Sequence, residues 1–68
     1  MKFILEIDCG NAAFALDCDD VVNAECQTEV ARILRWTAHN LANGYGDHFP
    51  LADANGNRVG TARFEVTP

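Results

Sequence analysis

The sequence is poor in cationic side chains and has no long apolar run. Its 68 residues contain five Lys and Arg against ten Asp and Glu, which gives a formal net charge of −5. A chain of this sign is poorly suited to bind nucleic acid or anionic membranes directly, because both attract basic surfaces. A basic protein partner remains compatible with it. At this length we expect one small domain, residues 1–68, with a limited core and no deep active site.

Cysteines are few, odd in number and widely spaced. Cys9, Cys18 and Cys26 match neither a paired disulfide framework nor the short chelating spacings of a zinc site. We therefore expect three free thiols and no bound metal. The apolar run Phe3–Leu5 is too short for a signal-peptide core or a membrane span, which predicts a protein of the cytoplasm.

The middle of the chain has the period of an amphipathic helix, from about Asn23 to Asn43. Asp19, Asp20 or Asn23 can cap its start. Gly44 follows its last turn, where glycine commonly ends a helix. The predicted apolar stripe of this helix consists of Cys26, Val30, Ile33, Leu34, Thr37 and Leu41.

Strand patterns flank the helix on both sides. Alternating side chains predict a first strand over residues 2–8, and an Asn-Gly turn predicts a hairpin of two more strands, Phe49–Ala52 and Arg58–Val66. Pro50 indicates that the first hairpin strand lies at a sheet edge or starts late, and Gly60 indicates a bulge. The sum is an α+β fold in the order β-α-β-β: a three-stranded, mainly antiparallel sheet with one amphipathic helix packed on one face.

The sequence has none of the common catalytic motifs. It lacks a glycine-rich phosphate loop, a Gly-x-Ser-x-Gly elbow and a His-Glu-x-x-His pair, so we expect no catalytic residue, no cofactor and no enzyme activity. The loop that starts at Asp53 begins like a calcium loop, but its twelfth position is Phe64 where a glutamate is required. Its Asp and Asn side chains are better explained as turn formers.

Negative charge is concentrated in the first part of the chain. Residues 1–29 hold seven acids and one base, net −6, whereas residues 30–68 hold three acids and four bases, net +1. Glu25 and Glu29 on the predicted helix are about 6 Å apart along its axis, a separation on the scale of the spacing between DNA phosphates. The alternative is that these acids cap the helix, complement its dipole and favour solubility. This acidic cluster consists of Asp17, Asp19, Asp20, Glu25 and Glu29.

Trp36 lies at the border between the apolar and polar faces of the predicted helix. It is either a flank of the core or an aromatic anchor for a partner, with Tyr45 nearby at the helix exit. Asp8 and Asp47 are weaker candidates for the charged surface. Whether these two acids approach the acidic cluster depends on the fold.

Several segments together resemble the short accessory proteins of bacteriophages and prophages. They are Met1–Asp8 with Asn11–Phe14, the helix segment Glu29–Arg35 and the ending Asp53–Gly60, and they cover most of the chain in order. Among such phage proteins, a small acidic chain is similar to the anti-CRISPR inhibitors, type I-C ones included, some of which imitate DNA with surface carboxylates.

This resemblance implies a non-catalytic inhibitor in the host cytoplasm. It would bind a subunit of a Cascade-type CRISPR-Cas complex that has a basic DNA-binding groove, through the acidic cluster and Trp36. We expect a monomer, with a homodimer as the alternative. The alternative function is a phage structural or regulatory module that meets its partner through the open sheet face or an edge strand.

Overall fold

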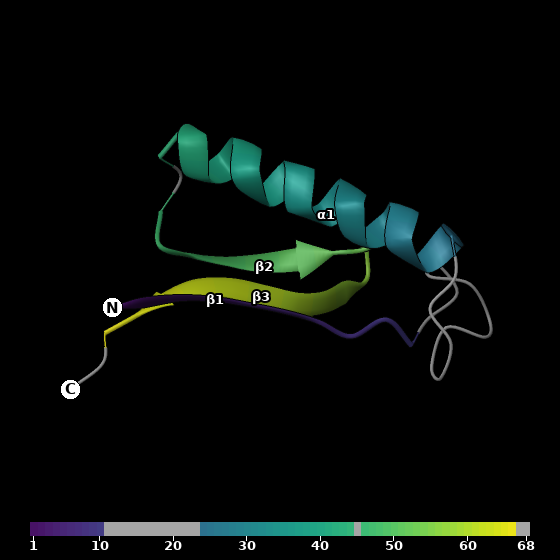
Figure 1. Ribbon diagram of the computed structural model, residues 1–68, viewed down its shortest axis with the longest axis horizontal. Helices are drawn as coiled ribbons and strands as arrows, with labels where there is room; N and C mark the ends of the chain where they lie inside the picture. Colours follow the sequence, from purple (N-terminus) through teal and green to yellow (C-terminus); the bar gives the residue numbers. More distant parts are fainter. Residues whose placement is uncertain (11–23, 45, 67–68) are drawn as a thin grey trace.

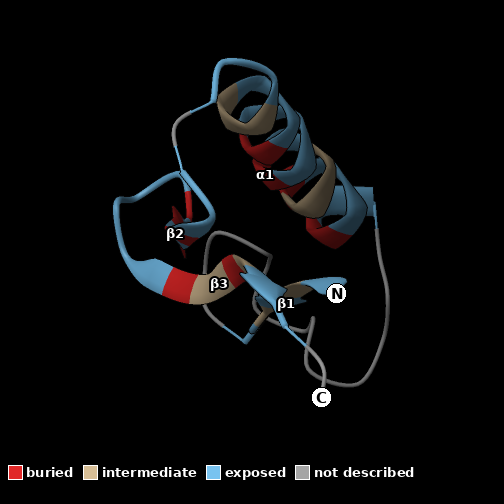
Figure 2. Cartoon of the chain, turned by 90° about the vertical axis from the view of Figure 1, so that its left-hand side faces the viewer, coloured by how far each residue is buried: buried red, intermediate tan, exposed pale blue. Residues whose placement is uncertain are grey.

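The computed structural model of the chain describes residues 1–10, 24–44 and 46–66. Within these residues three strands form one antiparallel sheet in the order β1-β3-β2, and a helix, α1, lies on one face of it (Figures 1 and 2). The predicted β-α-β-β arrangement is confirmed, and the sheet is wholly antiparallel. The elements are β1 (Lys2–Ile7), α1 (Ala24–Ala42), β2 (His48–Ala52) and β3 (Arg58–Glu65).

The C-terminal end of α1 is capped at Gly44, as the sequence predicts. Gly44 has a φ of 71°, which suits glycine, and its N–H donates to the C=O of Leu41 at 3.2 Å. Asn43 donates to the C=O of His39 from its backbone N–H at 3.1 Å and from Nδ2 at 2.8 Å. These bonds satisfy carbonyl groups that the end of a helix leaves open. The predicted capping residues at the start, Asp19, Asp20 and Asn23, lie outside the described residues.

The buried side of α1 is rotated relative to the predicted stripe. Cys26, Ile33 and Thr37 are buried as expected, but Leu34 is 46% exposed and Glu29 is only 6% exposed. The expectation that Leu34 is buried was therefore wrong. The reason is the position of α1, which lies closest to β2 at one edge of the sheet, so the helix side that carries Leu34 has little of the sheet beneath it.

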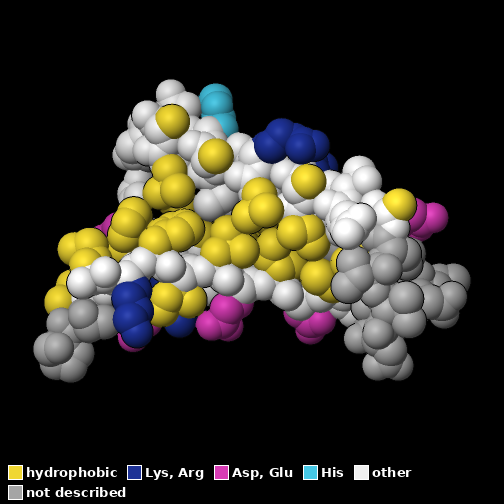
Figure 3. Space-filling model, viewed as in Figure 1, with side chains coloured by type: hydrophobic (Ala, Val, Ile, Leu, Met, Phe, Trp, Pro, Cys, Tyr) yellow, Lys and Arg dark blue, Asp and Glu magenta, His cyan; other side chains and the backbone are white. Residues whose placement is uncertain are grey.

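The core lies between α1 and the inner face of the sheet, where apolar side chains fill the space (Figure 3). Phe49 and Leu51 of β2 are buried there with Val59 and Ala62 of β3. Residues that pair across strands lie on the same face of the sheet. Ala62 pairs with Leu5 of β1 and with Phe49 of β2, so these three side chains form a row across the sheet beneath the helix. Leu5, on β1, is only partly buried.

A bulge interrupts the hairpin at the place that Gly60 predicts. The register between β2 and β3 shifts between Leu51 and Ala52, and the pairing skips Val59, which is the extra residue of the bulge. Gly60 has no room for a side chain, since a Cβ on it would lie 1.8 Å from the carbonyl oxygen of Glu6 in β1. Glycine at this position therefore permits the close approach of β1 to the bulged strand.

The hairpin confirms the predicted edge strand and turn. β2, which contains Pro50, is an edge strand of the sheet. In the turn after β2, the Oδ1 atom of Asp53 accepts the N–H groups of Asn55 at 2.9 Å and Asn57 at 2.8 Å, and Gly56 has a φ of 85°. The side chain of Asp53 thus forms the turn, as its type and position predict.

Cys26 overturns the expectation of three free thiols, because it takes part in a disulfide bond. Cys9 is a free thiol, packed against the core after the end of β1. Burial, and next the charge of Asp8, raise the pKa of the Cys9 thiol, which makes it a weak nucleophile at neutral pH. Spacing along the chain failed to predict the disulfide because a bridge depends on how close two Cα atoms lie in the folded protein.

Candidate partner-binding surface

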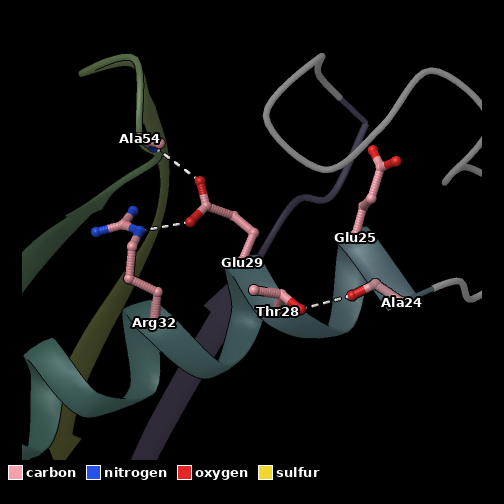
Figure 4. Close-up of a pocket in the computed structure, with 6 residues that line it drawn as sticks. All are labelled: Ala24, Glu25, Thr28, Glu29, Arg32 and Ala54. Atoms are coloured by element: carbon pink, nitrogen blue, oxygen red, sulfur yellow. Dashed lines mark hydrogen bonds and ion pairs between the residues drawn. The ribbon is translucent and has the colours of Figure 1, made fainter.

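The structure describes two of the five residues in the acidic cluster. Glu25 and Glu29 lie one turn apart on α1, whereas Asp17, Asp19 and Asp20 lie outside the described residues. Glu25 is exposed in the first turn, where a carboxylate complements the positive end of the helix dipole. Figure 4 shows its side chain apart from Glu29 and Arg32, and the side chain is exposed to solvent.

Glu29 points inward and joins α1 to the turn after β2. Its Oε1 accepts a hydrogen bond from Nε of Arg32, and its Oε2 accepts the N–H of Ala54 at 2.8 Å (Figure 4). Arg32 also donates from Nη2 to the C=O of Ala52 at 3.0 Å. Because both carboxylate oxygens bond within the chain and the side chain is buried, Glu29 does not offer its charge to a partner as the sequence suggested.

The electrostatics of this junction keep Glu29 ionised. The hydrogen bond from Arg32 lowers the pKa of the Glu29 carboxyl below its ordinary value. Burial opposes that change, while the N–H of Ala54 and the charge of Arg32 reinforce it and the nearby charge of Asp53 weakens it. The net result is a buried carboxylate with two donors, which is a satisfied structural group.

A shallow hollow lies beside the junction, and Figure 4 labels the residues that line it. Thr28 donates from Oγ1 to the C=O of Ala24 at 2.8 Å. The charged residues that line the hollow are Glu25, Glu29 and Arg32. The buried polar groups at this place are bonded to one another rather than aimed into the hollow. The hollow therefore fits a junction between helix and turn better than a small-molecule site.

Trp36 combines the two roles that the sequence left open. Its ring meets Phe49 edge-on, with the centroids 6.4 Å apart and an interplanar angle of 85°, so it covers the core beside β2. The side chain is nevertheless 43% exposed. It borders a second hollow together with Arg32, Pro50 and Ala52. An exposed aromatic face next to a cation is available to a partner at this place.

The weaker acidic candidates lie at opposite ends of the molecule. β1 ends near the start of α1, whereas α1 ends near the start of β2 (Figure 1). Asp8, directly after β1, therefore lies at the same end as Glu25. Asp47, directly before β2, lies at the other end, where its C=O accepts the N–H of Phe64 at 2.9 Å. Tyr45 lies outside the described residues.

The sequence analysis missed an exposed apolar band between α1 and β1. Figure 3 shows apolar side chains exposed between the helix and the sheet on the side that it views. The band consists of residues that are 41 to 46% exposed. The rings of Phe3 and Phe64 are in contact, with their centroids 5.0 Å apart and an interplanar angle of 55°. The sequence contained one signal for this band. The apolar stripe of the helix is wide, and β2 alone cannot cover its full width. The residues of the apolar band are Phe3, Leu34 and Phe64.

Comparisons of the chain with models of protein families, with curated proteins and with solved structures gave no match. Its function must therefore be inferred from its own surfaces. In the described part of the chain, no helix is long and apolar enough to cross a membrane. Nor do any three His, Cys, Asp or Glu side chains among those residues gather in a way that could hold a metal ion.

Proposed function

We propose that the protein is a phage-encoded anti-CRISPR inhibitor that binds a host type I surveillance complex, with type I-C as the leading candidate. In this proposal it imitates DNA and occupies a basic groove that otherwise holds the target duplex. The observation that carries the proposal is the charge distribution, seven of the ten acids lying in residues 1–29 with a single base. The resemblance to acidic phage accessory proteins supports it. The mechanism requires no catalysis and no direct contact with nucleic acid.

The described acids fit this proposal at the end of the molecule where α1 starts. Glu25 is exposed there, and β1 ends at the same place with Asp8 (Figure 1). Glu29 supports the surface indirectly, because it fixes the first half of α1 to the turn after β2. In the proposal the carboxylates that meet the partner's Arg and Lys are those of Glu25 and Asp8 together with Asp17, Asp19 and Asp20.

Exposed ion pairs alone would give little affinity. Each contributes about 0–1 kcal/mol, since solvent screens it. The summed field of several acids acts chiefly on the rate of association, and a desolvated anchor is needed to slow dissociation. Trp36, about three turns beyond Glu25 on α1 and 43% exposed, is the proposed anchor.

The proposed place of action is the cytoplasm of the host cell. The disulfide bond of Cys26 bears on this compartment, because disulfides rarely persist in a reducing cytosol. The proposal therefore requires that inhibition survive reduction of the disulfide.

The test measures binding of labelled target DNA to purified type I surveillance complexes by gel shift, over a salt series. The protein should prevent DNA binding at low salt, and DNA binding should recover as salt screens the carboxylates. Reversal of the acidic cluster apart from Glu29, by Asp17→Lys, Asp19→Lys, Asp20→Lys and Glu25→Lys together, should abolish inhibition. Full inhibition by this correctly folded variant would refute DNA mimicry.

A matched pair of single variants separates local from overall charge. Glu25→Lys and Glu65→Lys change the net charge equally, and both side chains are exposed on the described surface. Glu25 lies at the start of α1, whereas Glu65 ends β3 at the other end of the sheet. Only Glu25→Lys should weaken inhibition. Equal loss in both variants would show that overall charge, and not the proposed surface, is responsible.

A second candidate function is a phage structural or regulatory module that binds another protein. The observation that favours it is the apolar band, since exposed apolar surface can mark a site of contact with another protein. The gel-shift series discriminates the two functions. Failure to bind any type I complex, at low salt and at high protein concentration, would favour the module.

A further inference from the structure

In the sheet of the described residues, β1 is an edge strand with bonding groups that point away from β3. The N–H of Asp8 donates to the C=O of Val59 at 2.7 Å, which fixes the direction of the groups just after β1. In an antiparallel pair this direction alternates from residue to residue, so the N–H and C=O groups of Phe3, Leu5 and Ile7 point outward. No strand among the described residues pairs with that side of β1.

The two edges of the sheet differ in how they are protected. β2 carries Pro50, which has no N–H to offer, and its register with β3 is interrupted by the bulge. Proline and bulges are common devices that prevent edge strands from pairing with other chains. β1 has neither: its six residues run in unbroken register with β3, from Lys2 opposite Glu65 to Ile7 opposite Gly60. The β1 edge is therefore the one suited to extend the sheet.

The apolar band borders this same edge. Arg32 and Trp36 face the β2 side of the helix, since they contact Ala52 and Phe49 of that strand. Leu34 is two residues from each, so the helical period places it on the opposite flank, toward β1. An edge with free bonding groups thus adjoins apolar side chains without a cover in the described structure.

We propose that the β1 edge binds a second copy of this chain, with the two β1 strands antiparallel about a two-fold axis at Ile4. In this register Lys2 of each copy lies opposite Glu6 of the other, so two pairs of opposite charge form on the outer face of the joined sheet. Phe3 lies opposite Leu5 in hydrogen-bonded pairs, which join groups that both point outward. The edge is therefore complementary to itself in charge and in bonding pattern.

The neighbouring register is less favourable. Outward groups must face outward groups, so the next symmetric register toward the end of β1 is centred on Leu5. That register places Lys2 opposite Asp8, which lies beyond the end of β1, and it places Ile4 opposite Glu6, an apolar side chain against a carboxylate. The register centred on Ile4 keeps both charge pairs within the strand. A shift by a single residue is excluded because it would turn the apolar face of one strand to the outer side.

The dimer also covers the apolar band. A two-fold axis perpendicular to a continuous sheet puts both helices on the same face of six strands. The flank of α1 that carries Leu34 then faces the corresponding flank of the other copy, above the joined edges. Phe3 and Phe64 lie beneath this junction, with ring centroids 5.0 Å apart in each copy. Burial of this apolar surface supplies the main stabilisation, and the charge pairs set the register.

The experiment measures the mass of the purified protein by sedimentation over a range of concentrations. The expected mass is twice the 7.4 kDa of the chain, falling toward the single-chain value on dilution. Lys2→Glu and Glu6→Lys each replace two attractive pairs by two repulsive ones, which should raise the dissociation constant about tenfold. In an equimolar mixture of the two variants every pair is again attractive, so the mixture should dimerise more tightly than either variant alone.

Arg35→Glu is the control for net charge. It changes the charge as Lys2→Glu does, but Arg35 is exposed on the helix away from the β1 edge, so the dissociation constant should stay near that of the parent protein. A monomeric parent protein at all concentrations overturns the proposal. So does a dimer whose stability neither variant changes and whose mixture shows no gain, because the edge would then not be the interface.

Discussion

The buried carboxylate of Glu29 accepts a hydrogen bond from the backbone N–H of Ala54, and this bond joins the helix to the hairpin turn 25 residues later in the chain. The other carboxylate oxygen accepts a hydrogen bond from Arg32, which also donates to the C=O of Ala52. In a core this small, a polar junction of three hydrogen bonds is a substantial part of what fixes the helix on the sheet.

Glu29→Ala should therefore lower the free energy of unfolding by about 2 kcal/mol, because it leaves the Ala54 N–H without its acceptor and Arg32 without its partner. Urea denaturation followed by Trp36 fluorescence measures the change. Glu25→Ala, one turn earlier and exposed, is the control and should stay within about 0.5 kcal/mol of the parent. Equal stability of both variants would contradict a structural role for Glu29.

The lowered pKa of Glu29 predicts how stability depends on pH. Because the folded protein holds this carboxylate ionised to lower pH than the unfolded chain does, its contribution is complete above the ordinary pKa of glutamate, about 4.3, and is lost as the pH falls through the lower folded value. Urea denaturation of the parent and of Glu29→Gln from pH 7 to pH 3 measures it. The difference between the two proteins should shrink toward the acid end, and a constant difference would contradict the prediction.

Local signals in the sequence predicted the elements of the fold. Alternation gave β1, the 3.6-residue period gave α1, and the Asn-Gly turn gave the hairpin, because each signal depends on neighbouring residues. The position of the helix over one edge of the sheet depends on tertiary packing. Leu34 was therefore expected in the core and lies half exposed, although the stripe that contains it was read correctly as a helix face.

The candidate site was harder to predict for the same reason. Glu25 and Glu29 have the same residue type and lie one turn apart, and the sequence treats them alike. In the fold Glu25 faces solvent, whereas Glu29 finds two donors, one of them on a turn that no local pattern connects to the helix. The apolar band has a similar origin, since the rings of Phe3 and Phe64 meet only when β1 pairs with β3.

Gly60→Ala should be strongly destabilising. An alanine Cβ at this position would lie 1.8 Å from the carbonyl oxygen of Glu6, so β1 would have to move away from β3. We expect a loss of about 2–3 kcal/mol in the free energy of unfolding, measured by urea denaturation. Gly56→Ala is the comparison: nothing obstructs a Cβ there and only the φ of 85° is unfavourable, so its effect should be about 1 kcal/mol. A smaller effect at Gly60 than at Gly56 would show that β1 is not held as described.

The thiols should differ in their chemistry, and the difference bears on the proposed compartment. Alkylation of the denatured protein without reductant, read by peptide mass spectrometry, should modify Cys9 and leave Cys26 unmodified until the disulfide is reduced. In the folded protein Cys9 should react slowly at neutral pH, because burial and Asp8 raise its pKa. Reaction of Cys26 without reductant would contradict the disulfide.

Reduction should also lower stability, by about 2–4 kcal/mol, since a disulfide restricts the unfolded chain. An inhibitor that acts in a reducing cytoplasm must stay folded despite this loss, and the hydrogen bonds of the junction at Glu29 do not involve Cys26. Circular dichroism with and without reductant, beside the gel-shift assay of inhibition in the same buffers, gives the answer. Retained fold and inhibition after reduction agree with action in the cytoplasm. Unfolding on reduction would contradict it, and the oxidising space outside the cytoplasm would then be where the protein works.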